Sequence, residues 1–298
     1  MKKILIIGGS GFVGSNLIQY IPNDWEIFCT YNTTPITNSQ IKSYKIDLLD
    51  NPNEIINLIK NVQPHYIVDT VAFPSVDFCE EQPSIANKLH VDTTKIISTT
   101  SSKFNSKLLF LSTDAVFQGE LNKKYLETDY PNPINHYGLT KLNAEKSILT
   151  SSKRNIVLRT AVIYGANEKS RFTNWILSYL QEKKQVDPFI DQFNTPTLVD
   201  DLSLAIVKAL NSEIGGLFHA CGPTCINRFE FARLLANEFQ LDLSLIKPVT
   251  SNEKKQLAPR PISTCLDSSK FEKTFDFKFR SLEKGISYIA SELRKISS

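Results

Sequence analysis

The 298-residue sequence is poor in cysteine and glycine and carries little net charge. Its five cysteines are too few and too irregularly spaced for the disulfide framework of a small secreted domain. A net charge of +3 gives no field strong enough to favour nucleic acid as a partner. No apolar run approaches the roughly 20 residues that a membrane-spanning helix needs. These absences argue against nucleic-acid and membrane partners, and we expect a cytoplasmic protein.

The cysteines offer no convincing metal site. Cys221 and Cys225 have a C-x3-C spacing, but no second pair of ligands follows nearby. We interpret all five cysteines as buried free thiols and expect no bound metal. They are Cys29, Cys79, Cys221, Cys225 and Cys265.

Short β-rich runs alternate with helical patterns over the first two thirds of the chain. Ile4–Ile7 is a continuous apolar run, as expected for a parallel strand covered on both faces. Further strands are predicted at Trp25–Thr30, Ser43–Ile46, Tyr66–Val71, Lys107–Leu111 and Asn155–Leu158, and helices at Pro52–Lys60, Pro83–Ser102 and Asn135–Thr150. This alternation predicts an α/β fold with a Rossmann-type, doubly wound parallel sheet.

After about residue 165 the alternation loosens, and helical patterns are separated by loops rich in Pro, Asp, Asn and Thr. We therefore expect a dinucleotide-binding domain over residues 1–165. Residues 166–298 are expected to form mainly a smaller, C-terminal substrate-binding lobe, with some segments returning to the first domain. Helices are predicted there at Phe172–Glu182, Val199–Leu210, Phe229–Glu238 and Ser281–Leu293.

A glycine-rich turn follows the first strand and opens a helix. Gly8, Gly11 and Gly14 form G-x-x-G-x-x-G in a chain with only 11 glycines. A tight turn, close approach of the backbone to a pyrophosphate and close packing of helix on strand all favour glycine there. The turn predicts a dinucleotide diphosphate at the helix N-terminus, contacted by Gly8, Ser10, Gly11, Phe12, Val13 and Gly14. The alternative is a structural turn in an unrelated α/β protein.

The second strand ends without the carboxylate that usually binds an adenosine ribose and favours NAD. Tyr31 and Asn32 stand in this region, where hydroxyl and amide groups could accept a 2′-phosphate. NADP(H) is therefore the preferred cofactor, and NAD(H) stays an alternative. Asp47 and Leu48, after the third strand, are either adenine contacts or, for Asp47, a turn acid.

Tyr137 and Lys141 have the i, i+4 spacing that places two side chains on one helix face. A phenol has a pKa of about 10, and a nearby ammonium lowers it toward the range useful for acid–base catalysis. Thr113 ends an apolar strand and could hold the same substrate oxygen that Tyr137 protonates. Tyr179–Lys183 repeats the spacing without such a strand, and we interpret it as a surface pair.

These motifs resemble the extended short-chain dehydrogenase/reductase family, and within it the dTDP-4-dehydrorhamnose reductase group with its sugar-nucleotide-binding relatives. The resemblance runs almost from end to end. Besides the glycine turn, it is carried by Val76–Glu80, Ser112–Phe117, Tyr137–Lys141, Leu158–Gly165, Asp191–Thr197, Arg260–Pro261 and Leu266–Asp267.

The resemblance implies roles for individual residues. Thr113, Tyr137 and Lys141 would be the catalytic triad, with Lys141 also holding the nicotinamide ribose. Ala72 would lie beside the cofactor, and Arg260 near the diphosphate of the substrate. The remaining substrate contacts that it implies are Val76, Ala115 and Gln192.

Four departures from the family pattern matter. Ala115 stands where sugar dehydratases have glutamate, so dehydration is disfavoured. Ala115, Val162 and Pro74 replace residues that line the sugar pocket in rhamnose reductases, which predicts a reshaped pocket. Asp92 stands where many members of the family have an asparagine that steadies the groups relaying the proton.

Three functions are compatible with this pattern. The first is NADPH-dependent reduction of the 4-keto group of a nucleotide-linked deoxysugar. The second is a nucleotide-sugar epimerase that uses bound NAD. The third is a non-catalytic, NADP-binding regulatory subunit, because the beta subunit of methionine adenosyltransferase resembles the same group. A homodimer is left open as the assembly state.

Overall fold

The computed structural model describes residues 1–297 and has a seven-stranded parallel sheet at its centre. The strand order is β10-β6-β5-β4-β1-β2-β3. This is the doubly wound order of a Rossmann-type fold with one added edge strand, which confirms the predicted fold class. The strands are β1 (Lys2–Ile7), β2 (Trp25–Tyr31), β3 (Lys42–Lys45), β4 (Tyr66–Asp69), β5 (Lys107–Thr113), β6 (Ile156–Thr160) and β10 (Gly216–His219).

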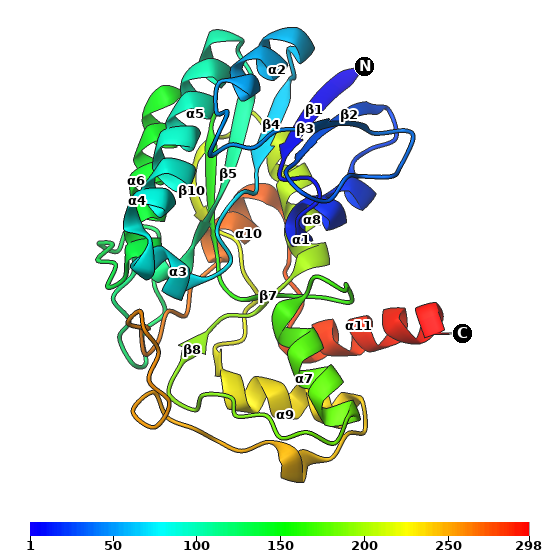
Figure 1. Cartoon of the computed structure of the whole chain (residues 1–298), viewed down its shortest axis with the longest axis vertical. Helices are drawn as coiled ribbons and strands as arrows, with labels where there is room; N and C mark the ends of the chain where they lie inside the picture. Colours follow the sequence, from blue (N-terminus) through cyan, green and yellow to red (C-terminus); the bar gives the residue numbers. More distant parts are fainter. Residues whose placement is uncertain (298) are drawn as a thin grey trace.

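Helices cover both faces of this sheet (Figure 1). One apolar core joins the sheet to α1 (Phe12–Leu17), α8 (Val199–Leu210) and α10 (Ser269–Phe275). A second core joins the opposite face to α2 (Glu54–Val62), α5 (Thr93–Lys103) and α6 (His136–Ser151). Because both faces are covered, Ile4–Ile7 is fully buried, as its continuous apolar run indicates.

A smaller lobe lies beyond the carboxyl ends of the strands, at the bottom of Figure 1. Its core is formed by α7 (Arg171–Gln181), α9 (Arg228–Glu238) and α11 (Leu282–Ser297). Two short strand pairs accompany it, β7 (Ile163–Tyr164) with β9 (Thr197–Leu198), and β8 (Phe193–Asn194) with β11 (Ile226–Asn227). Although β10, α8 and α10 also come from the last third of the chain, they pack on the central sheet.

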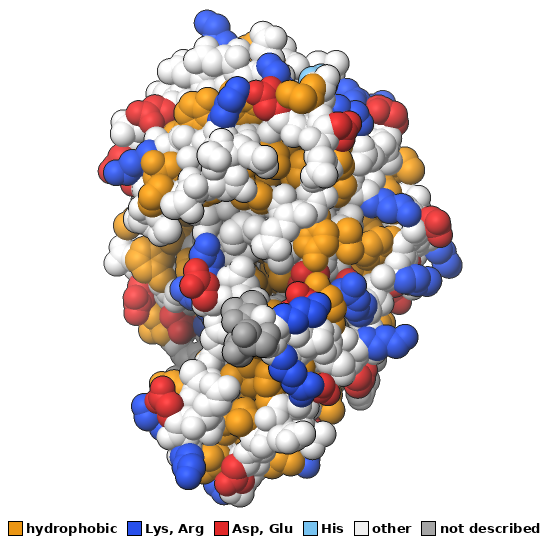
Figure 2. All heavy atoms as spheres, turned by 90° about the vertical axis from the view of Figure 1, so that its right-hand side faces the viewer, with side chains coloured by type: hydrophobic (Ala, Val, Ile, Leu, Met, Phe, Trp, Pro, Cys, Tyr) orange, Lys and Arg blue, Asp and Glu red, His pale blue; other side chains and the backbone are white. Residues whose placement is uncertain are grey.

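The surface and the helices add two further observations. Lys and Arg side chains are interspersed with Asp and Glu side chains over the face in Figure 2, and neither sign forms a continuous field there. Within residues 1–297, no helix combines the length and the apolar character needed to cross a bilayer.

The elements differ from the sequence prediction mainly where they are short or interrupted. The helix expected over Pro83–Ser102 is divided into α4 (Pro83–Asn87), a π-helical turn (Lys88–Asp92) and α5. The edge strand β10 was not predicted, because four residues carry little periodicity. The short helix α3 (Val76–Glu81) was also missed, although Ser75 caps it by accepting the backbone N–H of Phe78.

The expectation that all cysteines are free thiols was wrong for two of them. Cys225 and Cys265 form a disulfide, and Cys225 is exposed. They are 40 residues apart in sequence, so only the tertiary fold brings them together. Cys29, Cys79 and Cys221 are free and buried, as expected.

A buried ion pair fixes helix α6 on the sheet. Arg159 of β6 donates two hydrogen bonds to Glu145 of α6, at 2.9 and 2.7 Å, and the Ser112 hydroxyl of β5 donates to the same carboxylate. Both charged side chains are only 3% exposed. This bidentate geometry sets the position of α6, which carries Tyr137 and Lys141, relative to β5 and β6.

We expect Glu145→Ala to destabilise the protein by about 3–5 kcal/mol, because it leaves the Arg159 charge buried without its partner. Urea unfolding followed by circular dichroism measures this loss. Glu120→Ala is the matched control, since Glu120 is half exposed and pairs with Lys123 at the surface. A loss no larger than that of the control would show that the buried pair does not hold α6.

Candidate active site

A cavity lies at the carboxyl ends of β1 and β4, where the strand order reverses. Ligands of doubly wound sheets bind at this switch point. Eight predicted cofactor residues line it: Gly8, Ser10, Gly11, Tyr31, Asn32, Asp47, Leu48 and Ala72. Phe12, Val13 and Gly14 do not line it and lie in the first turn of α1. The structure thus brings together residues from the ends of β1, β2 and β4 and from the segment after β3.

The glycine turn has the geometry expected of a diphosphate cradle. Gly8 has a φ of +84°, which a side chain would strain, and its N–H donates to Thr30 Oγ1 at 3.0 Å. A Cβ on Gly14 would collide with the Gly8 carbonyl, so α1 packs directly on the turn. Gly11 caps α1 without a side-chain hydrogen bond. The first N–H groups of a helix have no partner within it, so this end of α1 fits a pyrophosphate.

Asp47 is a turn acid, which is one of the two roles that the sequence left open, and its contact with an adenine stays a prediction. It lines the switch-point cavity, and its Oδ1 also accepts the backbone N–H groups of Leu49 and Asp50, at 2.8 and 3.2 Å. The carboxylate therefore shapes the turn after β3 while bordering the space available to an adenine.

Sequence reasoning missed one cation at the adenosine end. Lys45 of β3 pairs in register with Tyr31 of β2 and lines an adjoining cavity together with Asn32 and Thr33. Three carboxylates, those of Asp47, Asp50 and Glu54, border the same cavity. The signal was weak because the lysine belongs to the neighbouring strand and not to the loop after β2.

Thr113 and Tyr137 meet at the carboxyl end of β5. Burial and then the Asp114 carboxylate raise the pKa of the Tyr137 phenol, and the nearby Thr113 hydroxyl partly opposes this shift. The net direction is upward, so Tyr137 carries its proton at neutral pH. Thr113 Oγ1 also donates to Asp114 Oδ1 at 3.1 Å.

Lys141 is buried on the same helix as Tyr137. Burial lowers the pKa of its ammonium to about 8, opposed by the charges of Asp69 and Glu145. The ammonium lies 3.9 Å from the Phe110 ring centroid. The i, i+4 spacing places both residues on α6, as predicted, and the lowering of the Tyr137 pKa by Lys141 stays a prediction.

His90 is a site residue that the sequence prediction missed. The Phe73 N–H donates to its Nε2 at 2.9 Å, so Nδ1 carries the proton and donates to Thr140 Oγ1 at 2.8 Å. Thr140 in turn donates to the Tyr137 carbonyl, and the His90 and Tyr137 rings meet edge to face at 5.7 Å. Asp92, which the sequence placed in the proton-relay region, is exposed. The π-helical turn directs His90, and not Asp92, to the site.

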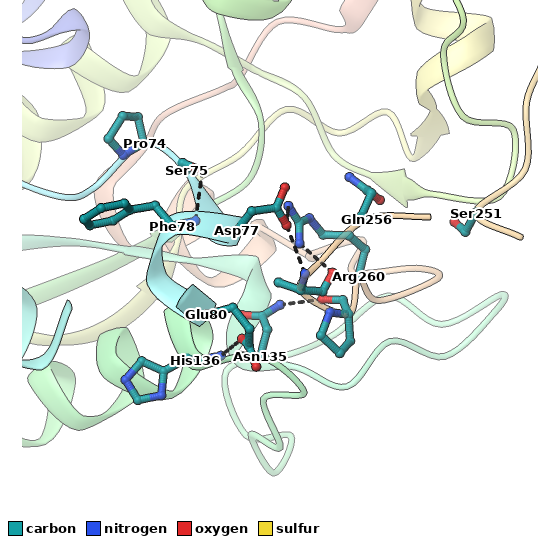
Figure 3. Close-up of polar contacts among 12 residues, drawn as sticks. Pro74, Ser75, Asp77, Phe78, Glu80, Asn135, His136, Ser251, Gln256 and Arg260 are labelled. Atoms are coloured by element: carbon teal, nitrogen blue, oxygen red, sulfur yellow. Dashed lines mark hydrogen bonds and ion pairs between the residues drawn. The ribbon is translucent and has the colours of Figure 1, made fainter. Parts of the chain in front are cut away.

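The substrate-side segment is fastened to α3 and to the start of α6. Figure 3 shows Asp77 pointing toward Arg260, whose Nη2 donates to Asp77 Oδ1 at 2.9 Å. Asp77 Oδ1 also accepts the backbone N–H of Ala258 at 3.0 Å. Asn135 caps α6 by accepting the Gly138 N–H and donates to the Pro259 carbonyl at 3.0 Å. These contacts place the loop of Arg260 over the helix that bears Tyr137.

The other predicted substrate contacts lie on three separate segments of the chain. Val76 is the first residue of α3, and Ala115 follows Asp114 in a 3-10 turn, and both are partly buried. Gln192 is buried and donates to Ser251 Oγ at 3.2 Å and to Gln256 Oε1 at 2.5 Å. Its amide is thus held by the loop before Arg260.

A glycine cradle at a switch point, together with a buried threonine on β5 and a partly buried tyrosine and a buried lysine on α6, defines a dinucleotide-binding protein of the short-chain dehydrogenase/reductase type. The profile of the family described as "RmlD substrate binding domain" matches residues 1–295. The chain belongs to this family.

Named relatives fall into two kinds. Methionine adenosyltransferase 2 subunit beta from Bos taurus is 31% identical over 285 residues, which cover 91% of this chain and 82% of the relative. dTDP-4-dehydrorhamnose reductase from Aggregatibacter actinomycetemcomitans is 26% identical over 286 residues, 92% of this chain and 94% of the relative. The structure of dTDP-4-dehydrorhamnose reductase from Bacillus anthracis with NADP matches 98% of this chain and 100% of its own, with a TM-score of 0.88 and 24% identity.

Two buried histidines predict a loss of stability in acid. Burial lowers the pKa of His90 and that of His219, each to about 3, so both stay neutral in the folded state. As the pH falls from about 6.5 toward 3, the unfolded chain binds protons that the folded chain does not, and the folded state loses stability.

Each histidine should contribute a slope of about 1.4 kcal/mol per pH unit below its unfolded pKa. Urea unfolding of wild type, His90→Gln and His219→Gln between pH 7.5 and 4.5 isolates these contributions. We expect the free energy of unfolding of each variant to fall less steeply with decreasing pH than that of wild type, by about 1.4 kcal/mol per pH unit. Parallel curves for all three proteins would contradict the buried, neutral state.

Proposed function

We propose that the protein reduces the 4-keto group of a nucleotide-linked deoxysugar with NADPH. The observation that carries this proposal is the position of Tyr137, whose ring packs edge to face on His90, which in turn accepts the N–H of Phe73 in the lining of the switch-point cavity. The reductase from Aggregatibacter actinomycetemcomitans and the NADP-bound structure from Bacillus anthracis support it by their overall similarity.

NADPH, when bound, supplies the hydride for the sugar carbonyl. The glycine turn would hold its diphosphate, and the side chains at the ends of β2 and β3 its adenosine. The absence of a carboxylate at positions 29–34 and the NADP bound in the structure from Bacillus anthracis support NADPH as the cofactor. Lys141 would hold the nicotinamide ribose, as the family resemblance implies.

The protein's own residues would then bind the carbonyl oxygen and donate the proton. Thr113 and Tyr137 would both hydrogen-bond the substrate carbonyl oxygen, which becomes an alkoxide as the carbon is reduced. An alkoxide is a much stronger base than a phenolate, so a phenol that keeps its proton at neutral pH is a competent donor. Tyr137 keeps its proton at neutral pH and can therefore act as this donor. His90, through Thr140, would hold the backbone of the donor in place.

A second function is favoured by one specific observation, the 31% identity to a subunit of methionine adenosyltransferase. Under this alternative the chain would bind the dinucleotide and a catalytic partner without turning over a sugar. Co-elution with a methionine adenosyltransferase catalytic subunit, together with no oxidation of NADPH by any nucleotide-linked 4-keto sugar, would favour it.

We expect Tyr137→Phe to lower NADPH-dependent reduction by a factor of roughly 10² to 10⁴, because the variant keeps the ring but loses the proton donor. NADPH affinity should stay within about twofold of wild type. Turnover is measured by NADPH absorbance with a panel of nucleotide-linked 4-keto sugars, and affinity by fluorescence titration.

Tyr179→Phe is the matched control, because Tyr179 has the same spacing from Lys183. Tyr179 is 43% exposed on α7, and the cation nearest to its ring is Lys184, at 5.8 Å. This control should retain wild-type turnover. Equal activity of both variants would remove Tyr137 from the proton-donor role.

A further inference from the structure

The Cys225–Cys265 disulfide joins two segments that flank the same short strand. Cys225 directly precedes β11, which pairs with one edge of β8. The segment of Cys265 lies on the other edge of β8, where Phe193 forms a parallel bridge with Ser263. The bond therefore ties together the two outer neighbours of β8, although its cysteines are 40 residues apart in sequence.

The two bonded cysteines differ in their exposure. Cys225 is exposed, whereas Cys265 is fully buried. Thiol–disulfide exchange begins when a thiolate attacks one sulfur of the bond, so the reagent needs access to that sulfur. Cys225 is the end that a small thiol can reach in the folded protein, and Cys265 is then the leaving group. This arrangement permits reduction without unfolding, which a disulfide buried at both ends does not.

The segment that carries Cys265 has little regular structure of its own. Residues 262–267, here called the Cys265 segment, form isolated bridges and belong to no helix or strand. The Thr264 N–H donates to the Phe193 carbonyl at 2.9 Å, and the Tyr125 N–H donates to the Cys265 carbonyl at 2.8 Å. Isolated hydrogen bonds open more readily than those within a large sheet, so a covalent bond adds much of the order here.

Thr264 connects the Cys265 segment to the candidate active site. Its hydroxyl donates to Asp114 Oδ2 at 2.5 Å, and Asp114 Oδ1 accepts the Thr113 hydroxyl at 3.1 Å. Because Thr264 directly precedes Cys265, the disulfide restrains the residue that holds the Asp114 carboxylate. The exposed Cys225 is thus linked to the Thr113 hydroxyl through one disulfide, the backbone of Thr264 and two hydrogen bonds.

We propose that the Cys225–Cys265 disulfide is a redox-sensitive latch on the site, opened by a dithiol reductant that attacks Cys225. One thiolate of the reductant bonds to Cys225 Sγ and breaks the S–S bond, and Cys265 leaves as a thiolate that takes up a proton. The second thiol of the reductant then displaces Cys225 and closes a disulfide within the reductant. Two electrons pass from the dithiol to the protein, which gains two thiols.

Reduction frees the Cys265 segment from β11 but leaves its hydrogen bonds in place. The segment then opens more often, because loss of the cross-link restores conformational freedom to the chain between the two cysteines. Each opening releases Thr264 from Asp114, so the carboxylate and the Thr113 hydroxyl lose their fixed position. The oxidised protein therefore holds this part of the site in order more firmly than the reduced protein.

Thiol trapping under native conditions tests the accessible end of the latch. The full chain is oxidised with oxidised glutathione, incubated with or without dithiothreitol, and then denatured and alkylated with N-ethylmaleimide. Mass spectrometry should count three alkylated cysteines in the oxidised form, since Cys29, Cys79 and Cys221 are free, and all five after dithiothreitol. Five free thiols after oxidation would overturn the proposal, as would reduction that proceeds only at the rate of global unfolding.

Hydrogen–deuterium exchange of the oxidised and reduced forms tests the effect on the site. We expect peptides that cover residues 112–118 and 262–267 to exchange roughly 10-fold faster in the reduced form, and the melting temperature to fall by about 5–10 °C. Peptides from α2 should exchange at equal rates in both forms. Equal exchange of the Cys265 segment in both forms would contradict the latch.

Cys225→Ser and Cys221→Ser form a matched pair of variants. Cys225→Ser removes the bond, so it should exchange like the reduced wild type and should not respond to dithiothreitol. Cys221→Ser removes a buried free thiol four residues earlier and keeps the bond, so it should respond like wild type. A response that persists in Cys225→Ser, or that is lost in Cys221→Ser, would overturn the proposal. The comparison of wild type with and without dithiothreitol does not require either variant to fold.

The latch and the proposed function fail separately, because none of these measurements uses a sugar substrate. A dithiol response in a chain that reduces no nucleotide-linked 4-keto sugar would retain the latch and remove the reductase function. Reductase activity in a chain without the dithiol response would do the reverse.

Discussion

The buried anchoring of α6 on β5 and β6 is the constraint on which the site depends. Arg159 and Ser112 hold Glu145 inside the protein, and Tyr137 projects from the same helix two turns earlier. This fixes the phenol beside Thr113, at the end of the strand next to β4 in the sheet. β4 borders the switch point, and Phe73, which follows β4 and lines the cavity, donates its N–H to His90, whose ring packs on Tyr137.

The last third of the chain completes the site from the opposite side. The loop of Arg260 is bonded to α3 through Asp77 and to the cap of α6 through Asn135 (Figure 3). The Cys225–Cys265 disulfide joins this loop region to the start of α9. The loop of Arg260 is thus positioned relative to α6 by direct bonds and not by the lobe's core alone.

Local signals in the sequence were sufficient for the fold and for the cofactor side. The glycines Gly8 to Gly14 directly follow a strand, so the turn could be predicted from the sequence. The strand that ends at Thr113 distinguished the Tyr137–Lys141 pair from the equally spaced Tyr179–Lys183 pair. Contacts made by distant segments were not readable. His90 is directed inward by a π-helical turn, Lys45 acts from a neighbouring strand, and Cys225 finds Cys265 only in the fold.

The central claim is that this chain transfers a hydride and is not only a dinucleotide-binding scaffold. Mass spectrometry of the sugar product, formed with NADPH deuterated at the transferred position, tests this claim most directly. The account predicts one deuterium at the former keto carbon and one NADPH consumed for each product molecule. NADPH that binds tightly but is neither consumed nor a source of label, for every nucleotide-linked 4-keto sugar supplied, would contradict it.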